Sequence, residues 1–228
     1  MTAVTLATLR TRARERADMP AAGFIPDSAT GIDAFINEGV QRLHEKLVEA
    51  YASDYVEKQQ AFTTTGADSV ALPADFYKLL GVDLNSSDGT VVTLAPFPRG
   101  MRNVYKNSAN DGLGYRTRFK LSGANTLRLL PAPVAGMTGV IWYSPAATLL
   151  TATVDFVDFP NGWERYVVLY AAIQMKMKQE SGIGELQNEL LKMEAELQTI
   201  ADRRDLSAPS HAVDVDQVEA SDWRRWLP

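Results

Sequence analysis

The sequence predicts an α+β fold in which N- and C-terminal helices form one helical bundle, an antiparallel β region is inserted, and an extended C-terminal arm follows. Three observations support this prediction. Apolar residues recur at spacings of three and four near both ends, the middle alternates apolar and polar residues, and periodicity is lost after Asp205. We therefore expect a discontinuous bundle at residues 1–54 and 159–205, a β region at 55–158 and a docking arm at 206–228.

The N-terminal part predicts two helices. A short amphipathic helix begins near Leu6, and we expect its four arginines to face solvent. Polar residues after Pro26 begin a second helix, in which Thr30 and Asp33 have the spacing of a capping box. The apolar stripe of this second helix consists of Ile32, Phe35, Ile36, Val40, Leu43, Leu47 and Tyr51.

The middle of the chain predicts a small antiparallel meander. We expect Gly66–Asp68 to form a hairpin turn between strands at 57–65 and 69–72. Residues 96–114 contain two prolines and three glycines, which indicates an irregular excursion. Residues 115–121 alternate strictly, so Tyr, Thr, Phe and Leu are predicted on one face and three cations on the other. Two more strands are predicted at 126–130 and 138–143.

The C-terminal part predicts two further helices. Asn161 and Glu164 have the spacing of a helix start, and Gly182 and Gly184 interrupt the helical pattern. The second of these helices carries a seam that is too short for an independent coiled coil, so we expect it to pack on its neighbours. The seam residues are Leu186, Leu190, Met193, Leu197 and Ile200.

Composition excludes several classes of site. The chain has no cysteine, which rules out disulfides, thiolate metal sites and cysteine nucleophiles. Its two histidines, His44 and His211, are too few for a histidine-rich metal site, and we expect a helix-surface or packing role for His44. The phosphate-binding, dinucleotide-binding and hydrolase motifs are missing, so no cofactor is expected. No segment resembles a signal peptide or a membrane span, which favours a soluble, unsecreted protein.

Charge is distributed unevenly along a chain whose net charge is −5. Residues 97–128 contain seven basic residues and one acidic residue, whereas residues 155–228 contain fourteen acidic and eight basic residues. The basic set is a candidate face for the backbone of duplex DNA, without base readout, or for a partner protein. Simple solvation is the third interpretation. The set consists of Arg99, Arg102, Lys106, Arg116, Arg118, Lys120 and Arg128.

Two other functional classes remain open. Asp155 with Asp158, or Glu164 nearby, could supply the carboxylate pair of a cell-wall-degrading enzyme, although turn and capping roles are commoner at such positions. A free DNA-binding regulator would use the basic face, and loss of Arg116 and Arg118 would then weaken its salt-dependent binding.

The end of the chain carries two tryptophans and two arginines within five residues. Trp and Arg are typical interface anchors, and a segment that lacks periodic structure can order on a partner. We therefore expect this end to dock on a partner rather than on its own domain. The docking residues are Trp223, Arg224, Arg225, Trp226 and Leu227.

Five short motifs follow one another between residues 72 and 172, within a resemblance that covers roughly residues 4–204. They are LPADF at 72–76, LRLLPAP at 127–133, IWY at 141–143 with Pro145, FPNGWE at 159–164 and YAA at 170–172. In order and spacing, this series resembles the head-to-tail adaptor, or connector, proteins of tailed bacteriophages.

The resemblance implies a non-enzymatic virion structural protein at the head–tail junction, made in the host cytoplasm. It implies a ring, commonly of twelve copies, that lies beneath the portal protein, extends the DNA channel and provides a platform for the tail. Duplex DNA would pass through the lumen without sequence readout. The arm would order on the portal or on a neighbouring subunit. From charge alone, and not from the resemblance, the basic set could face either the lumen or a tail or nozzle protein.

Overall fold

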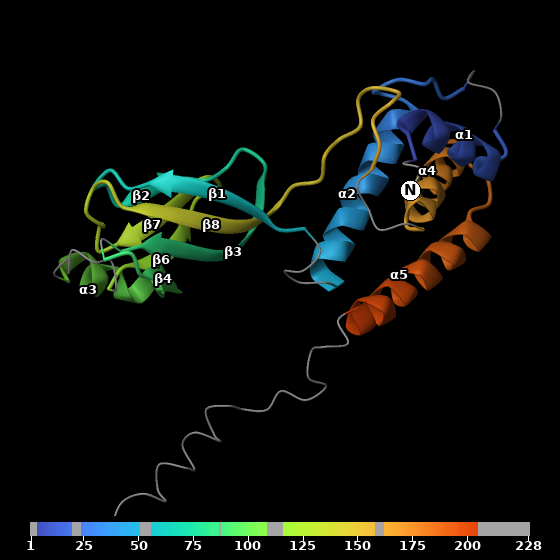
Figure 1. Ribbon diagram of the computed structural model, residues 1–228. Helices are drawn as coiled ribbons and strands as arrows, with labels where there is room; N and C mark the ends of the chain where they lie inside the picture. Colours follow the sequence, from blue (N-terminus) through green and yellow to red (C-terminus); the bar gives the residue numbers. More distant parts are fainter. Residues whose placement is uncertain are drawn as a thin grey trace, which may run out of the picture.

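The computed structural model describes residues 4–19, 24–50, 56–86, 88–108, 116–157 and 162–204, and its fold is of the α+β class. Figure 1 shows two parts side by side, a helical unit and a β unit. The chain begins in the helical unit, passes through the β unit and returns to the helices. The predicted fold class is therefore confirmed.

The helical unit consists of α1 (Leu6–Ala17), α2 (Ile32–Ala50), α4 (Glu164–Lys178) and α5 (Gly184–Arg204). The central helix is α4, because it packs against α1, α2 and α5. Its buried residues therefore lie on several sides rather than on one stripe. They are Tyr166, Val167, Val168, Leu169, Ala171, Ala172, Ile173 and Met175.

The predicted seam of α5 packs on this core. Met193 and Leu197 are buried, and Leu186 and Leu190 are partly buried against the same cluster. The hydroxyl of Tyr166 donates a hydrogen bond to the Glu194 carboxylate at 2.8 Å, which satisfies a polar group inside the α4–α5 contact. Helices from the two ends of the chain therefore share one hydrophobic core.

Two arginines of α1 are drawn out of solvent, contrary to the prediction that they face it: Arg14 is buried and Arg10 is half-buried. Arg10 forms a bidentate ion pair with Asp33 of α2, with an Nε–Oδ1 distance of 2.6 Å and an Nη2–Oδ2 distance of 2.8 Å. Arg14 donates from Nη2 to the carbonyl oxygen of Ile25 at 2.6 Å. Both guanidinium groups tolerate burial because fixed oxygen acceptors satisfy them. The predicted capping box is also wrong, since Asp33 binds Arg10 rather than the backbone of Thr30.

The turn before α2 closes around the carbonyl group of Pro26. This oxygen accepts the backbone N–H of Ile32 at 3.1 Å. A Cβ atom at Gly31 would lie 2.0 Å from the same oxygen, so only glycine fits this close approach. The turn brings the start of α2 beside α1, where Asp33 meets Arg10.

The β unit contains two four-stranded sheets. The first has the order β1-β8-β3-β4, formed by β1 (Lys58–Thr63), β8 (Thr138–Pro145), β3 (Phe76–Asn85) and β4 (Val91–Thr93). The second has the order β2-β7-β6-β5, formed by β2 (Ser69–Ala71), β7 (Thr126–Leu130), β6 (Arg118–Ser122) and β5 (Ala95–Pro96). Neighbouring strands are antiparallel, as predicted, except that β5 runs parallel to β6. The predicted meander is wrong, because the strands divide between two sheets and β8 lies between β1 and β3.

Side chains from both sheets share the core of the β unit. The first sheet contributes from β3 and β8, and the second contributes from β7. The buried members are Leu72, Val82, Leu84, Leu94, Leu127, Leu129, Met137, Ile141 and Tyr143. Because each sheet buries one face on the other, the β unit has a core separate from that of the helices.

The predicted hairpin at Gly66–Asp68 is wrong. β1 pairs with β8 and β2 pairs with β7, so the chain between them crosses from one sheet to the other. Thr64 holds this crossing, since its hydroxyl donates to the Val134 carbonyl oxygen at 2.5 Å and accepts the Met137 N–H at 2.9 Å. These partners lie some seventy residues away in the chain, and a local turn pattern does not encode them.

The predicted excursion at 96–114 contains regular structure. A 3-10 turn, η1 (Arg99–Met101), continues into α3 (Arg102–Asn107). The predicted strand at 115–121 forms as β6, but Leu121 is 41% exposed although the alternation placed it on the apolar face. Residues 109–115, which include the rest of the excursion, lie outside the described ranges.

Loss of the Arg10 side chain is expected to destabilise the fold. In Arg10→Ala the Asp33 carboxylate stays buried without its partner, which costs about 3 kcal/mol of unfolding free energy. Urea denaturation measures the change. Arg12→Ala is the matched control, because Arg12 is exposed on the same helix. Equal stability of both variants would contradict the structural role of the ion pair.

Candidate functional site

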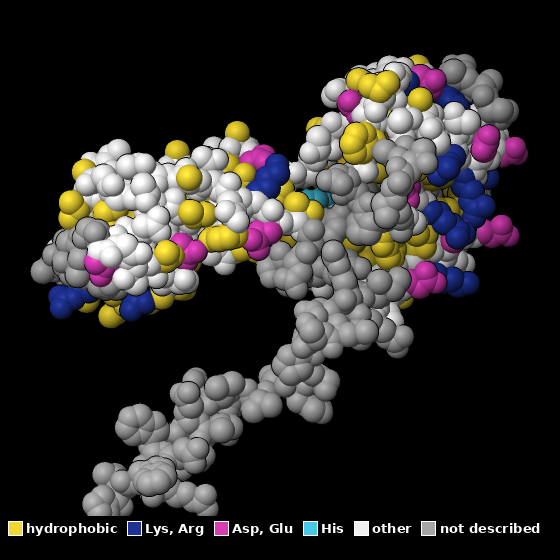
Figure 2. Space-filling model, in the orientation of Figure 1, with side chains coloured by type: hydrophobic (Ala, Val, Ile, Leu, Met, Phe, Trp, Pro, Cys, Tyr) yellow, Lys and Arg dark blue, Asp and Glu magenta, His cyan; other side chains and the backbone are white. Residues whose placement is uncertain are grey.

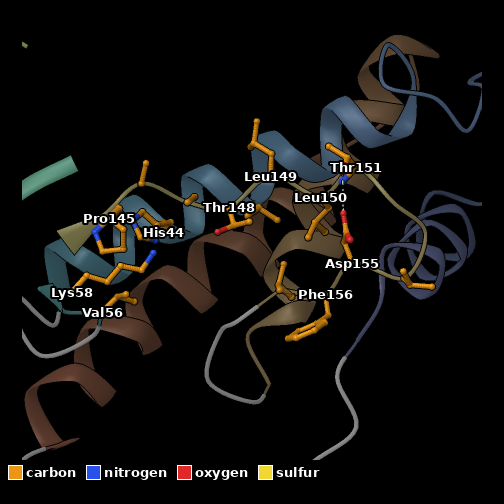
Figure 3. A pocket seen from close by; sticks show the side chains of 15 residues that line it. His44, Val56, Lys58, Pro145, Thr148, Leu149, Leu150, Thr151, Asp155 and Phe156 are labelled. Carbon is orange, nitrogen blue, oxygen red and sulfur yellow. Dashed lines mark hydrogen bonds between the residues drawn. The ribbon is translucent and has the colours of Figure 1, made fainter. Parts of the chain in front are cut away.

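A pocket of about 760 Å³ lies where the β unit joins the helical unit, and we call it the junction pocket (Figure 3). One wall comes from α2, another from the start of β1, and the rest from the segment that leads from β8 back to the helices. We call this segment, residues 146–157, the return segment. The pocket is lined by Val40, His44, Val56, Lys58, residues 145–151 and residues 154–157.

Hydrogen bonds to both N-terminal helices hold the return segment. The Asn37 side chain donates to the Leu150 carbonyl oxygen at 2.9 Å and accepts the Leu150 N–H at 2.8 Å. At the start of α1, the Leu6 N–H donates to the Asp155 carbonyl oxygen at 2.8 Å. This last bond satisfies one of the N–H groups that a helix leaves without an intrahelical partner. The return segment is thus fixed to the helical unit by backbone groups.

His44 links α2 to the end of β8. Its ring is buried, and Nε2 lies 2.9 Å from the carbonyl oxygen of Pro145. The ring also makes an edge contact with Tyr77 of β3, at 5.6 Å between ring centroids. Burial lowers the pKa of His44, while the hydrogen bond to Pro145 and the nearby Glu45 oppose this shift. A neutral imidazole that donates from Nε2 fits this site, in agreement with the packing role predicted from the sequence.

The rim of the junction pocket carries exposed apolar side chains. Leu149, Val154 and Phe156 are 47%, 72% and 56% exposed, although all three are large and hydrophobic. None of these three residues is among the site residues predicted from the sequence. The only local signal is their position between a strand and a helix, in a stretch without periodicity. Exposed apolar side chains that gather around a pocket are typical of contact surfaces.

The candidate carboxylates have structural roles. Asp155 accepts the backbone N–H groups of Thr151 at 2.8 Å and Ala152 at 2.7 Å, and these bonds lower its pKa. Glu164 accepts the Gly162 N–H at 2.9 Å, next to the start of α4. A sugar-cleaving general acid instead needs a raised pKa. Asp158, the third candidate, lies outside the described residues.

A second pocket, of about 540 Å³, gathers four of the seven predicted cations, and we call it the basic pocket. Arg99 and Arg102 come from η1 and the start of α3, while Lys120 and Arg128 come from β6 and β7. In Figure 2, Lys and Arg side chains gather at this end of the β unit. The lining consists of Phe97, Arg99, Arg102, Lys120, Leu121, Ser122, Gly123, Arg128 and Leu130.

The other three predicted cations do not line the basic pocket. Lys106 is exposed on α3, Arg118 is half-buried on β6, and Arg116 is exposed just before β6. The five predicted docking residues, Trp223, Arg224, Arg225, Trp226 and Leu227, lie outside the described part of the chain.

The basic pocket keeps most of its positive charge. Lys120 and Arg128 are directly opposite each other on β6 and β7, an arrangement that repels like charges. Arg128 has one acidic neighbour, Asp68, at 3.9 Å. Within the described ranges no carboxylate forms an ion pair with Arg99, Arg102 or Lys120. An anionic group in the pocket would therefore relieve repulsion.

No described helix is both long and apolar enough to cross a membrane. The described residues also contain no cluster of three or more His, Asp or Glu side chains arranged to hold a metal ion.

These features define a class of protein: an α+β chain whose two ends build a helical unit and whose middle forms a β unit with a cationic pocket. The family model of the SU10 adaptor proteins matches residues 4–214, and the chain belongs to this family. The resemblance to head-to-tail adaptors is thereby confirmed.

Comparison with solved structures and with curated proteins adds two findings. A chain in the neck of an empty GTA particle, computed with C6 symmetry, is similar at 17% sequence identity with a TM-score of 0.26. The similarity covers 77% of this chain and 82% of that chain. No curated protein matches.

Acidification is expected to weaken the contact made by His44. Its pKa is lowered in the folded state, so the unfolded chain binds a proton more readily as the pH falls through about 6.5. Stability is therefore fully present above this pH and is lost below it. Urea denaturation at about pH 7.5 and pH 5.5 measures the loss. His44→Gln keeps a side-chain N–H donor but does not titrate, so it should lose less stability; an equal loss in both proteins would contradict the assignment.

Proposed function

We propose that this protein is a virion structural protein, a head-to-tail adaptor whose copies form a ring beneath the portal. The observation that carries the proposal is the family match, which extends over residues 4–214 and so includes both the helical unit and the β unit. The ring, commonly of twelve copies, extends the DNA channel and provides the platform for the tail. The protein is made in the host cytoplasm and resides at the head–tail junction of the virion.

The helical units pack laterally in this proposal. A ring requires that each copy present two surfaces that match its neighbours. The exposed apolar rim of the junction pocket, formed by Leu149, Val154 and Phe156, is a surface that such a contact would cover. The β unit carries the basic pocket away from the helical core, so a different partner can reach it.

Three further partners belong to the proposal. The Trp-Arg-Arg-Trp end of the docking arm, residues 206–228, docks on the portal or on a neighbouring subunit. The tail or nozzle protein binds the opposite side of the ring. Duplex DNA passes through the lumen and is contacted without base readout.

The non-enzymatic role is supported by the family and by the geometry of the carboxylates. Asp155 is engaged by two backbone N–H groups, which stabilise its ionised form. Family membership favours a structural adaptor over both alternatives, the cell-wall-degrading enzyme and the free DNA-binding regulator.

Electron microscopy of this protein mixed with portal rings from the same source tests the proposal. We expect the full chain to form a ring that stacks on the portal, with a matching increase of mass in light scattering. A chain that ends at Asp205 should not stack, because it lacks the docking arm. Trp223→Ala/Trp226→Ala in the full chain should weaken stacking by at least about tenfold, since two interface anchors are lost.

A control separates loss of docking from loss of folding. His211→Ala changes the arm without touching its Trp-Arg-Arg-Trp end and should stack like the unchanged protein. Absence of any association between the full chain and portal rings would overturn the proposal. Turnover of cell-wall substrate that is lost in Glu164→Ala would favour the enzyme instead.

A further inference from the structure

Among the residues that the structure describes, none pairs with the edge of strand β6 where it borders the basic pocket. The Phe97 N–H donates to the Phe119 carbonyl oxygen at 3.0 Å, so the backbone groups of Phe119 face β5. Backbone groups of residues two apart in a strand point to the same side, and those of Leu121 therefore face this side too. The pairing of β5 with β6 reaches no further than Phe119, so β5 ends before Leu121.

An independent bond confirms this orientation. The Leu129 N–H donates to the carbonyl oxygen of Asp68 at 2.9 Å, on the side of β7 that faces away from β6. Leu129 is the register partner of Phe119, so this pair does not exchange hydrogen bonds between β6 and β7. Two residues further along, Leu121 and Leu127 form the next pair that does not exchange hydrogen bonds between β6 and β7. The backbone of Leu121 is therefore available for an added strand.

The two faces of this edge differ in character. Leu121 lies on the apolar face of β6, where a buried side chain is expected, but it is 41% exposed. Lys120 alternates with it and, with Arg128 opposite, supplies positive charge on the other face. Arg99 and Arg102 enclose the same pocket. An extended segment with apolar residues on one face and carboxylates on the other would match both faces.

The chain itself contains such a segment. In residues 213–217, Val213 and Val215 alternate with Asp214 and Asp216. Alternation with a period of two places the valines on one face of a strand and the aspartates on the other. The surrounding residues 205–222 contain five acidic residues and no Lys or Arg. The segment is therefore complementary to the pocket both in charge and in pattern.

We propose that residues 213–217 of this chain bind as an added strand along the free edge of β6. The valines would cover Leu121, and the two aspartates would lie beside Lys120 and Arg128 and relieve their repulsion. A peptide is favoured over duplex DNA because the open N–H and C=O of a strand edge pair with another backbone. The inference does not depend on the proposed virion role, since both partners belong to this chain.

The absence of cysteine from the sequence permits a direct test in the full chain. A double variant, Leu121→Cys with Val215→Cys, places two thiols on the same face of neighbouring strands, within reach of a disulfide. Mild oxidation followed by non-reducing electrophoresis measures the cross-linked fraction. Binding should raise its rate by about tenfold over the control, because docking raises the effective concentration of the two thiols.

The control is Leu191→Cys with Val215→Cys. Leu191 is 62% exposed on α5 and lies closer in sequence to the acidic segment than Leu121 does. Random encounters should therefore favour the control pair. Equal cross-linking of the two pairs in folded protein would overturn the proposal.

Charge variants test the attraction between the acidic segment and the cations of the basic pocket. Arg99→Glu/Lys120→Glu, placed in the Leu121–Val215 cysteine pair, should lower the cross-linking rate by about fivefold, and high salt should act in the same direction. Lys78→Glu/Lys192→Glu makes the same change in net charge at exposed positions outside the pocket and should have little effect. The proposal would be overturned by two results together. The Leu121–Val215 pair would cross-link only at the control rate, and labelled duplex DNA would bind the full chain but not its Arg99→Glu/Lys120→Glu variant. The basic pocket would then be assigned to DNA.

Discussion

The attachment of the return segment to α1 and α2 is the constraint on which the rest of this protein depends. The β unit is inserted between the second and fourth helices, so the chain must come back to the helical unit before α4 can fill its core. Asn37 binds Leu150 through two hydrogen bonds, and His44 meets Pro145 at the point where β8 ends. These contacts join two separate hydrophobic cores through backbone groups.

Charge is organised differently in the two units. In the helical unit, the half-buried Arg10 and the buried Arg14 bind fixed oxygen acceptors, so their charge serves packing between helices. In the β unit, Lys120 and Arg128 face each other and hold a positive potential at the surface. The first arrangement stabilises the fold. The second leaves a repulsion between Lys120 and Arg128, which a bound anionic group would reduce. This difference separates structural arginines from candidate binding residues.

The adaptor family and these surfaces fit one view of function. An assembly protein works through contact surfaces rather than a catalytic cleft, and here an apolar rim, a cationic pocket and an acidic C-terminal region lie on different parts of the chain. Burial of His44 beside Pro145 couples the junction of the two units to protonation, since a charged imidazole is costly there.

The α+β class, the helices at both ends and the cationic character of the middle could be read from the sequence, because helical and strand periodicities and charge are local properties. Tertiary structure alone decided which strands pair. The segment at Gly66–Asp68 connects the two sheets, because the Thr64 side chain forms hydrogen bonds with Val134 and Met137. It also decided that Arg10 pairs with Asp33 and that four of seven cations share one pocket, since both depend on partners distant in the chain.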